Sequence, residues 1–225
     1  MSESIWSRFG LFIALTVSAQ APRATITPSN PVAMSFIPRP VLPGQQLRAG
    51  DVILTRNGGL FAFLIRWGTR TGRNGINHAG VVAADQTEPG APVETIEAVA
   101  SGVVLSVRSN LTGYVFRLTD DPAVAQEVVA AARSFLGTPY DWVGIARFAV
   151  ICLRGRWWGK PFAALLATVL PDEDDGMRVF CSDHVSQALT KVWGDLGLGP
   201  TYAVAPIDLL RYFIGYGSHI PGQQL

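Results

Sequence analysis

The sequence predicts a single α+β domain in which helices pack on an antiparallel sheet. Short apolar segments separated by turn residues fill residues 48–118, which is typical of strands joined by short connections. From residue 121 onward the apolar residues recur at helical spacing instead. The length of 225 residues and the 48% hydrophobic content suit one compact unit with appendages.

Several segments of the first half are expected to form strands, because each is apolar and is bounded by turn signals. They are residues 51–55, 78–83, 93–99, 103–107 and 114–118. Residues 60–67 are apolar and are expected to be helical, and the stretch from Gly68 to Gly75 is expected to be a loop.

Helices are expected in the second half. The first begins at Asp121-Pro122, since proline is favoured in the first turn of a helix, and ends before Gly137 and Pro139. Its apolar face consists of Val124, Val128, Ala131, Ala132 and Phe135. A second helix begins near Cys181, with a face made of Val185, Ala188, Leu189 and Val192. A third is expected at residues 206–214.

Composition excludes several classes of protein. A net charge of +1 gives no reason to expect a nucleic-acid partner. No apolar run reaches the roughly 18–20 residues that span a bilayer. Two cysteines are too few for a disulfide framework or a structural zinc site, and a bridge between Cys152 and Cys181 would consume the thiol discussed below. Nothing in the sequence indicates a cofactor.

Residues 1–43 are expected to be an apolar N-terminal segment followed by a Pro-rich arm, and the folded domain is expected to cover 44–225. Residues 9–17 resemble the apolar core of a signal peptide, and Ala19-Gln20-Ala21 resembles a cleavage site. Glu3 and Pro22 argue against cleavage. The alternative is a retained arm that packs on the domain or on an assembly partner.

Two short segments carry groups suited to thiol chemistry. Phe180-Cys181-Ser182-Asp183-His184-Val185 places a thiol at the start of an expected helix, where backbone amides favour the thiolate. Asn77-His78-Ala79-Gly80-Val81-Val82 places an imidazole at the start of an expected strand. A thiol and an imidazole in these places predict nucleophilic catalysis, with the imidazole taking the thiol proton.

The order of several motifs resembles the circularly permuted branch of the papain-like fold. The matching segments are Ala49-Gly50-Asp51-Val52-Ile53, Asn77 to Val82, Thr95-Ile96-Glu97-Ala98, Gly137-Thr138-Pro139-Tyr140-Asp141, Val179-Phe180-Cys181-Ser182 and Ala205-Pro206-Ile207-Asp208-Leu209. That branch includes YiiX-like amidases, and its relatives resemble NlpC-type cell-wall peptidases and lecithin:retinol acyltransferases. In unpermuted relatives the cysteine helix precedes the histidine strand, whereas here it follows.

The resemblance implies catalytic roles for three residues. Cys181 would be the nucleophile, His78 the general base and later the general acid, and Glu97 the residue that orients the imidazole. The backbone N–H of Cys181 would help to hold the oxyanion. Glu94 is the alternative orienting residue, but residues three apart on a strand point to opposite faces, so only one of the two can face His78. The Ile-Glu-Ala context favours Glu97.

Tyr140, Ser182 and His184 are candidates for contacts with substrate or oxyanion. For Tyr140 the alternative is a ring that covers the core at a turn, and for His184 it is a purely local structural role. Cys152 lies in an apolar run and is expected to be a core residue. A metal site made of Cys181, Asp183, His184 and His78 is disfavoured, because adjacent helical residues cannot both point the way Cys181 does.

Residues 142–170 form a Trp-rich insertion, expected to be helical. Trp157 and Trp158 lie next to Arg156 and Lys160, a combination typical of anchors at a membrane interface. The alternative is a helical hairpin packed on the domain, which these two rings would cap.

Together these observations predict a thiol hydrolase that cleaves an amide-type bond through an acyl-thioester. The first expected substrate is a peptidoglycan peptide, in keeping with the resemblance and with a cell-envelope or secreted location. The second is a lipid amide or ester, cleaved or transferred by an acyltransferase. The third possibility is a non-catalytic structural or binding module of an envelope or particle assembly.

Overall fold

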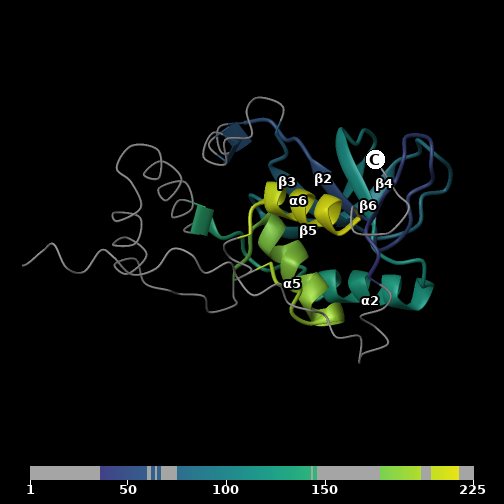
Figure 1. Ribbon diagram of the computed structural model, residues 1–225. Coiled ribbons are helices and arrows are strands. Elements are labelled where there is room, and N and C mark those ends of the chain that lie inside the picture. The colour runs from purple at the N-terminus through teal and green to yellow at the C-terminus, as the bar shows by residue number, and fades with distance from the viewer. Residues whose placement is uncertain are drawn as a thin grey trace, which may run out of the picture.

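The fold is a six-stranded antiparallel sheet with helices packed against it (Figure 1). The structure is a computed structural model, and it describes residues 36–59, 62–63, 65–66, 75–142, 144–145, 178–198 and 204–217. The strands run in the order β1-β6-β2-β3-β4-β5, and every neighbouring pair is antiparallel. Their bounds are β1 Arg39–Pro40, β2 Val52–Thr55, β3 His78–Val82, β4 Val93–Val99, β5 Gly102–Arg108 and β6 Gly113–Arg117. The expected α+β class is therefore confirmed.

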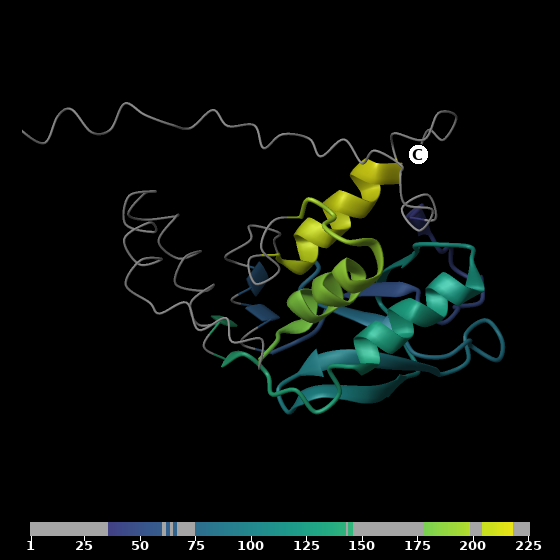
Figure 2. The same cartoon turned by 90° about the horizontal axis from the view of Figure 1, so that it is seen from below.

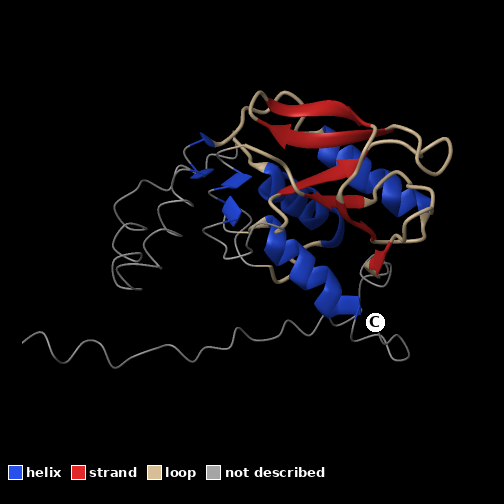
Figure 3. Ribbon diagram, turned by 90° about the horizontal axis from the view of Figure 1, so that it is seen from above, coloured by secondary structure: helices blue, strands red, loops and turns tan. Residues whose placement is uncertain are grey.

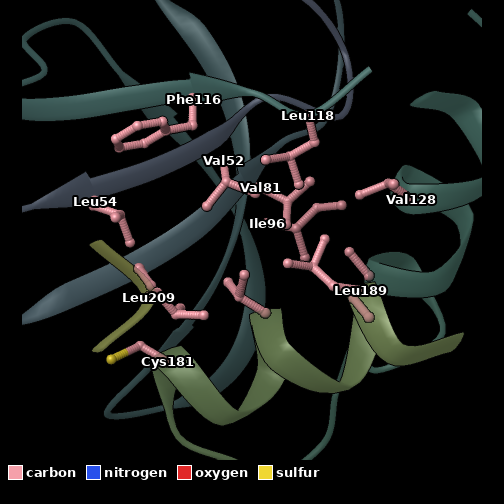
Figure 4. Close-up of a cluster of buried hydrophobic side chains, with 14 of the residues drawn as sticks. Val52, Leu54, Val81, Ile96, Phe116, Leu118, Val128, Cys181, Leu189 and Leu209 are labelled. Carbon is pink, nitrogen blue, oxygen red and sulfur yellow. The ribbon is translucent and has the colours of Figure 1, made fainter. Parts of the chain in front are cut away.

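Helices α2 (Pro122–Arg133) and α5 (Cys181–Trp193) lie side by side along the sheet, and α6 (Pro206–Gly217) packs beyond α5 (Figure 2). Colouring by secondary structure makes the separation of helices from strands plain (Figure 3). Strand alternation creates the main core, because every second residue of the inner strands faces α2, α5 and α6. Figure 4 shows this cluster, which includes Val52, Leu54, Val81, Ile96, Val128, Leu189 and Leu209.

Helix α2 begins where the sequence predicts. The side chain of Asp121 accepts a hydrogen bond from the backbone N–H of Ala123 at 2.9 Å, and Pro122 occupies the first turn. Helix α5 has no such cap: Phe180 precedes it in an extended conformation, with φ −109° and ψ 174°. Gly194, at φ 77°, ends α5 in a backbone conformation that glycine adopts without strain.

The fold begins earlier than the sequence analysis places it. Phe36 is 3% exposed and packs edge-on against Trp193, with ring centroids 5.0 Å apart. The N–H of Ile37 donates to Leu118 O at 2.7 Å, and the short strand β1 pairs with β6. Residues 36–43, assigned above to the Pro-rich arm, therefore contribute to the core and the sheet.

Several expectations fall on residues outside the described ranges. They concern the N-terminal segment up to residue 35 and most of the Trp-rich insertion, with Cys152, Trp157 and Trp158. Within the described ranges, every helix falls short of the length and apolarity that crossing a bilayer requires.

Candidate active site

The thiol of Cys181 lies where the first turn of α5 meets the start of β3. Its Sγ is 3.9 Å from the backbone oxygen of Asn77, the residue that precedes β3. Cys181 is a free cysteine and is 2% exposed (Figure 4). The extended backbone at Phe180 leads directly into the helix, so Cys181 is the first helical residue, in the turn whose backbone N–H groups lack partners within the helix.

His78, the first residue of β3, joins this thiol to the sheet. The side chain of Cys181 acts on its imidazole and raises its pKa, and its Nε2 donates to Oε2 of Glu97 at 2.6 Å. Because Nε2 is engaged by the carboxylate, Nδ1 is the ring nitrogen that serves the sulfur. The fold thus brings together Cys181, His78 and Glu97, which come from α5, β3 and β4, and a hydrogen bond joins the last two.

Glu97 is 0% exposed, and both of its carboxylate oxygens are saturated with donors. Oε1 accepts from Thr95 Oγ1 at 2.5 Å and from Arg108 Nε at 2.8 Å. Oε2 accepts from His78 and also from Nη2 of Arg108. Glu94 is exposed, so strand alternation separates the two glutamates as expected and brings Glu97 to the imidazole.

Gly80 makes room for this carboxylate. It is the partner of Glu97 across β3 and β4, and a Cβ added to it would lie 2.8 Å from Cγ of Glu97 and 3.1 Å from Ile96 O. By the period of two along a strand, Gly80 shares a side of β3 with His78. The absent side chain lets Glu97 lie close to the sheet, within reach of the imidazole.

The surroundings favour the charged forms of His78 and Glu97. Burial opposes the imidazolium, but the hydrogen bonds and charges of Cys181 and Glu97 outweigh it and raise the pKa of His78 to about 9. Burial also opposes ionisation of Glu97, yet the hydrogen bonds from Arg108, His78 and Thr95 hold its pKa well below the usual range. At neutral pH the site therefore holds an imidazolium next to a carboxylate.

An apolar cluster flanks the thiol. It consists of Ile65, Ile145 and Phe180, with Tyr140 packed against them. Tyr140 bridges to Val179 just before Cys181, and its ring lies 4.9 Å from that of Trp142. Burial and the charges of Cys181 and Asp141 raise the pKa of the Tyr140 phenol, which keeps it neutral.

The other two candidates from the sequence, Ser182 and His184, make their hydrogen bonds to backbone oxygens rather than to the sulfur. Ser182 is fully buried and donates to Val204 O at 2.6 Å, which ties α5 to the segment before α6. His184 is also fully buried, and its Nε2 bonds to Ala132 O at 3.2 Å while its ring meets Phe135 edge-on. Burial lowers the pKa of His184 to about 4, so this ring is a neutral part of the α2–α5 interface.

A cavity of about 350 Å³ lies at the other end of β2. Asp51 and Arg117 line it, and Arg117 donates to both carboxylate oxygens of Asp51 at 3.0 and 2.9 Å. Thr55, which pairs with His78, ends β2, whereas Asp51 precedes it, so the cavity is remote from the thiol. Across the described ranges no three His, Cys, Asp or Glu side chains gather closely enough to hold a metal ion.

Sequence reasoning missed the residues that support the site. Arg108 and Thr95 hold Glu97, as described above. The Asn77 side chain accepts from the N–H of Asn57 at 2.7 Å and donates to Ala62 O at 3.2 Å, which fixes the neighbouring loop against the start of β3. The signal for Arg108 was strand register, because it is a charged residue on the side of β5 that faces Glu97.

Compared with protein-family models, with curated proteins and with solved structures, the chain shows no significant match in any of the three.

Proposed function

We propose that this protein is a thiol hydrolase with a circularly permuted papain-like fold, in which Cys181, His78 and Glu97 form the catalytic triad. The observation that carries the proposal is the buried His78–Glu97 hydrogen bond, with the thiol of Cys181 near enough to the imidazole to raise its pKa. A thiol, a base that it contacts and a third group that orients the base are the parts nucleophilic catalysis requires. The motif order described above supports the same class.

The proposed reaction begins with the thiolate of Cys181 attacking a substrate carbonyl carbon. A C–S bond forms, and the carbonyl π electrons move to oxygen. When the tetrahedral intermediate collapses, the C–N bond breaks and His78 gives its Nδ1 proton to the leaving amine. Water then attacks the acyl-thioester, His78 takes a proton from it, and the thiolate departs from the released acid.

Two parts of the site assist this course. Glu97 accepts from Nε2, so it holds the proton there and leaves Nδ1 to exchange protons with sulfur, amine and water. The N–H of Cys181, at the start of α5, is suited to stabilise the developing oxyanion. The sulfur is 2% exposed, so the acyl group would have to reach it past the apolar cluster.

Alkylation of the thiol tests the class. We expect iodoacetamide to modify Cys181 at pH 6, where a free thiol is almost wholly protonated, and to modify Cys152 far more slowly. His78→Gln should slow the reaction of Cys181 at least about tenfold. His184→Gln is the matched control, because it removes a second buried histidine that does not bond to the sulfur. Equal, slow labelling of both cysteines would instead favour a non-catalytic structural or binding module.

The first substrate candidate is the peptide of peptidoglycan, on the strength of the resemblance. Purified peptidoglycan should release muropeptides with the wild-type protein and none with Cys181→Ala. The second candidate is a lipid amide or ester, or an acyl transfer from one, and the apolar cluster next to the thiol favours it. Hydrolysis rates that rise with acyl-chain length on N-acyl amides, with peptidoglycan left intact, would select the lipid substrate.

A further inference from the structure

The burial of Glu97 would, on its own, favour the protonated form of its carboxyl group. The side chain is completely buried, and burial disfavours a carboxylate. If the Glu97 carboxyl took up a proton, it would lose part of its capacity to accept hydrogen bonds and would no longer be an acceptor-only partner for the His78 imidazole. This group therefore stays ionised through its partners, of which Arg108 acts most strongly, followed by His78 and Thr95.

Arg108 is placed to do this. Its Nε and Nη2 each donate to a different oxygen of Glu97, which is the bidentate geometry typical of strong arginine–carboxylate pairs. Register puts Arg108 opposite Val93, four residue pairs along from Glu97, so its side chain runs back along the sheet past Thr95. The Arg108 side chain is about one-third exposed, so burial opposes its charge less than it opposes that of Glu97.

We infer that Arg108 is a positioning residue of the proposed triad, which holds Glu97 ionised and aligned so that the imidazole is presented to the thiol. The charges then alternate from His78 to Arg108: imidazolium at His78, carboxylate at Glu97 and guanidinium at Arg108. Each charge is neighboured by its opposite, which is how buried charges become tolerable. The inference rests on the proposed function for its catalytic meaning, but the ionisation of Glu97 can be measured without it.

Among the residues that the structure describes, two further ionisable groups act on the proposed triad. His184 on α5 acts on His78, and Tyr140 interacts with Cys181. Both are held neutral at neutral pH, His184 by a lowered pKa and Tyr140 by a raised one. The groups that lower the pKa of Glu97 are Arg108, His78 and Thr95, and Thr95 carries no charge.

The direct experiment titrates the side-chain carboxyl carbon of Glu97 by ¹³C NMR in full-length Cys181→Ala protein. In Arg108→Met, which keeps the length of the stem, the midpoint of the titration should rise by at least about one pH unit. Arg117→Met is the matched control, since it removes an equivalent bidentate arginine–carboxylate pair at the remote end of β2. It should cost comparable stability and leave Glu97 unmoved.

The second measurement follows the rate of Cys181 alkylation from pH 4 to pH 10 in the otherwise wild-type chain. In Arg108→Met the acid limb of this profile should shift to higher pH by about one unit, so that the alkylation rate at a fixed acid pH falls about tenfold. Arg108→Lys, which keeps the charge without the fork, should move it less and also covers the case that the methionine variant does not fold.

An unchanged Glu97 titration in Arg108→Met would overturn the inference, as would an alkylation profile lowered uniformly without a shift. If Arg108→Met does not fold, an unchanged Glu97 titration in Arg108→Lys would overturn it. If Glu97 shifts as expected but wild-type Cys181 reacts no faster than a free thiol at any pH, the support of Glu97 stands and the proposed catalysis fails.

Discussion

Replacing Cys181 by alanine should lower the pKa of His78. The imidazole has two supports, the side chains of Cys181 and Glu97, and each contributes a hydrogen bond and an opposite charge. Burial of the ring works against both. Removing the sulfur leaves burial opposed by Glu97 alone, so the imidazolium becomes harder to maintain.

The size of the effect follows from the present pKa. A rise from 6.5 to about 9 corresponds to about 3 kcal/mol in favour of the imidazolium. An opposite charge within hydrogen-bond reach is worth about 1–3 pKa units. We therefore expect the pKa of His78 to fall by about two units in Cys181→Ala. In Cys181→Ser, which retains a polar partner for the imidazole, the pKa of His78 should lie between the wild-type value and the value in Cys181→Ala.

Titration of the ring by ¹⁵N NMR measures this pKa. The chain has three histidines, and the signal of His78 is identified as the one that disappears in His78→Gln. A His78 pKa that stays near 9 in Cys181→Ala would show that Glu97 alone raises it. A wild-type pKa below 6.5 would show that burial prevails, and the thiolate–imidazolium pair would then have to be abandoned.

Further expectations concern stability. Glu97→Gln leaves the arginine without its ionised partner and should cost about 3 kcal/mol in urea unfolding at pH 7; a loss below about 1 kcal/mol would contradict a tightly held pair. Gly80→Ala pushes a methyl group against Cγ of Glu97, so it should lower the free energy of unfolding by about 1–3 kcal/mol and slow alkylation of the thiol. No change in either calorimetry or labelling would contradict this. Between pH 6.5 and about 4, the unfolded state binds a proton at His184 that the folded state does not. About 3 kcal/mol of stability, present above pH 6.5, should therefore be lost as pH falls through this window. His184→Phe should flatten that dependence, and an equally steep acid transition would refute it. Asp121→Ala removes the cap of α2 and should cost about 1 kcal/mol without changing thiol labelling.

The elements that local sequence controls were predicted well. Helix α2 begins at its capping aspartate and proline, and α5 buries the predicted Val185, Ala188 and Leu189. These features depend on residues within one or two turns of each other, so periodicity and capping suffice to find them. Strands β2 to β6 were found for the same reason, with ends that differ by one residue in β2, β3, β5 and β6, whereas β1 was missed.

The candidate site was only partly accessible to this reasoning. Alternation along β4 chose between Glu94 and Glu97 because it is a local rule. Arg108 required the register of β5 against β4, which turns back at residues 100–101. That register would have pointed to Arg108, since it is the one charged residue on the side of β5 that faces Glu97.

The sequence by itself determined the α+β class, the start of each main helix and the choice of a thiol, an imidazole and a carboxylate as partners. Tertiary structure alone decided that Phe36 belongs to the core, that His184 faces Ala132 rather than the sulfur, and that an arginine stabilises the carboxylate. The physical reason is range. Periodicity and capping are written within a few neighbouring residues, whereas burial and charge pairing depend on which distant segments the folded chain brings together.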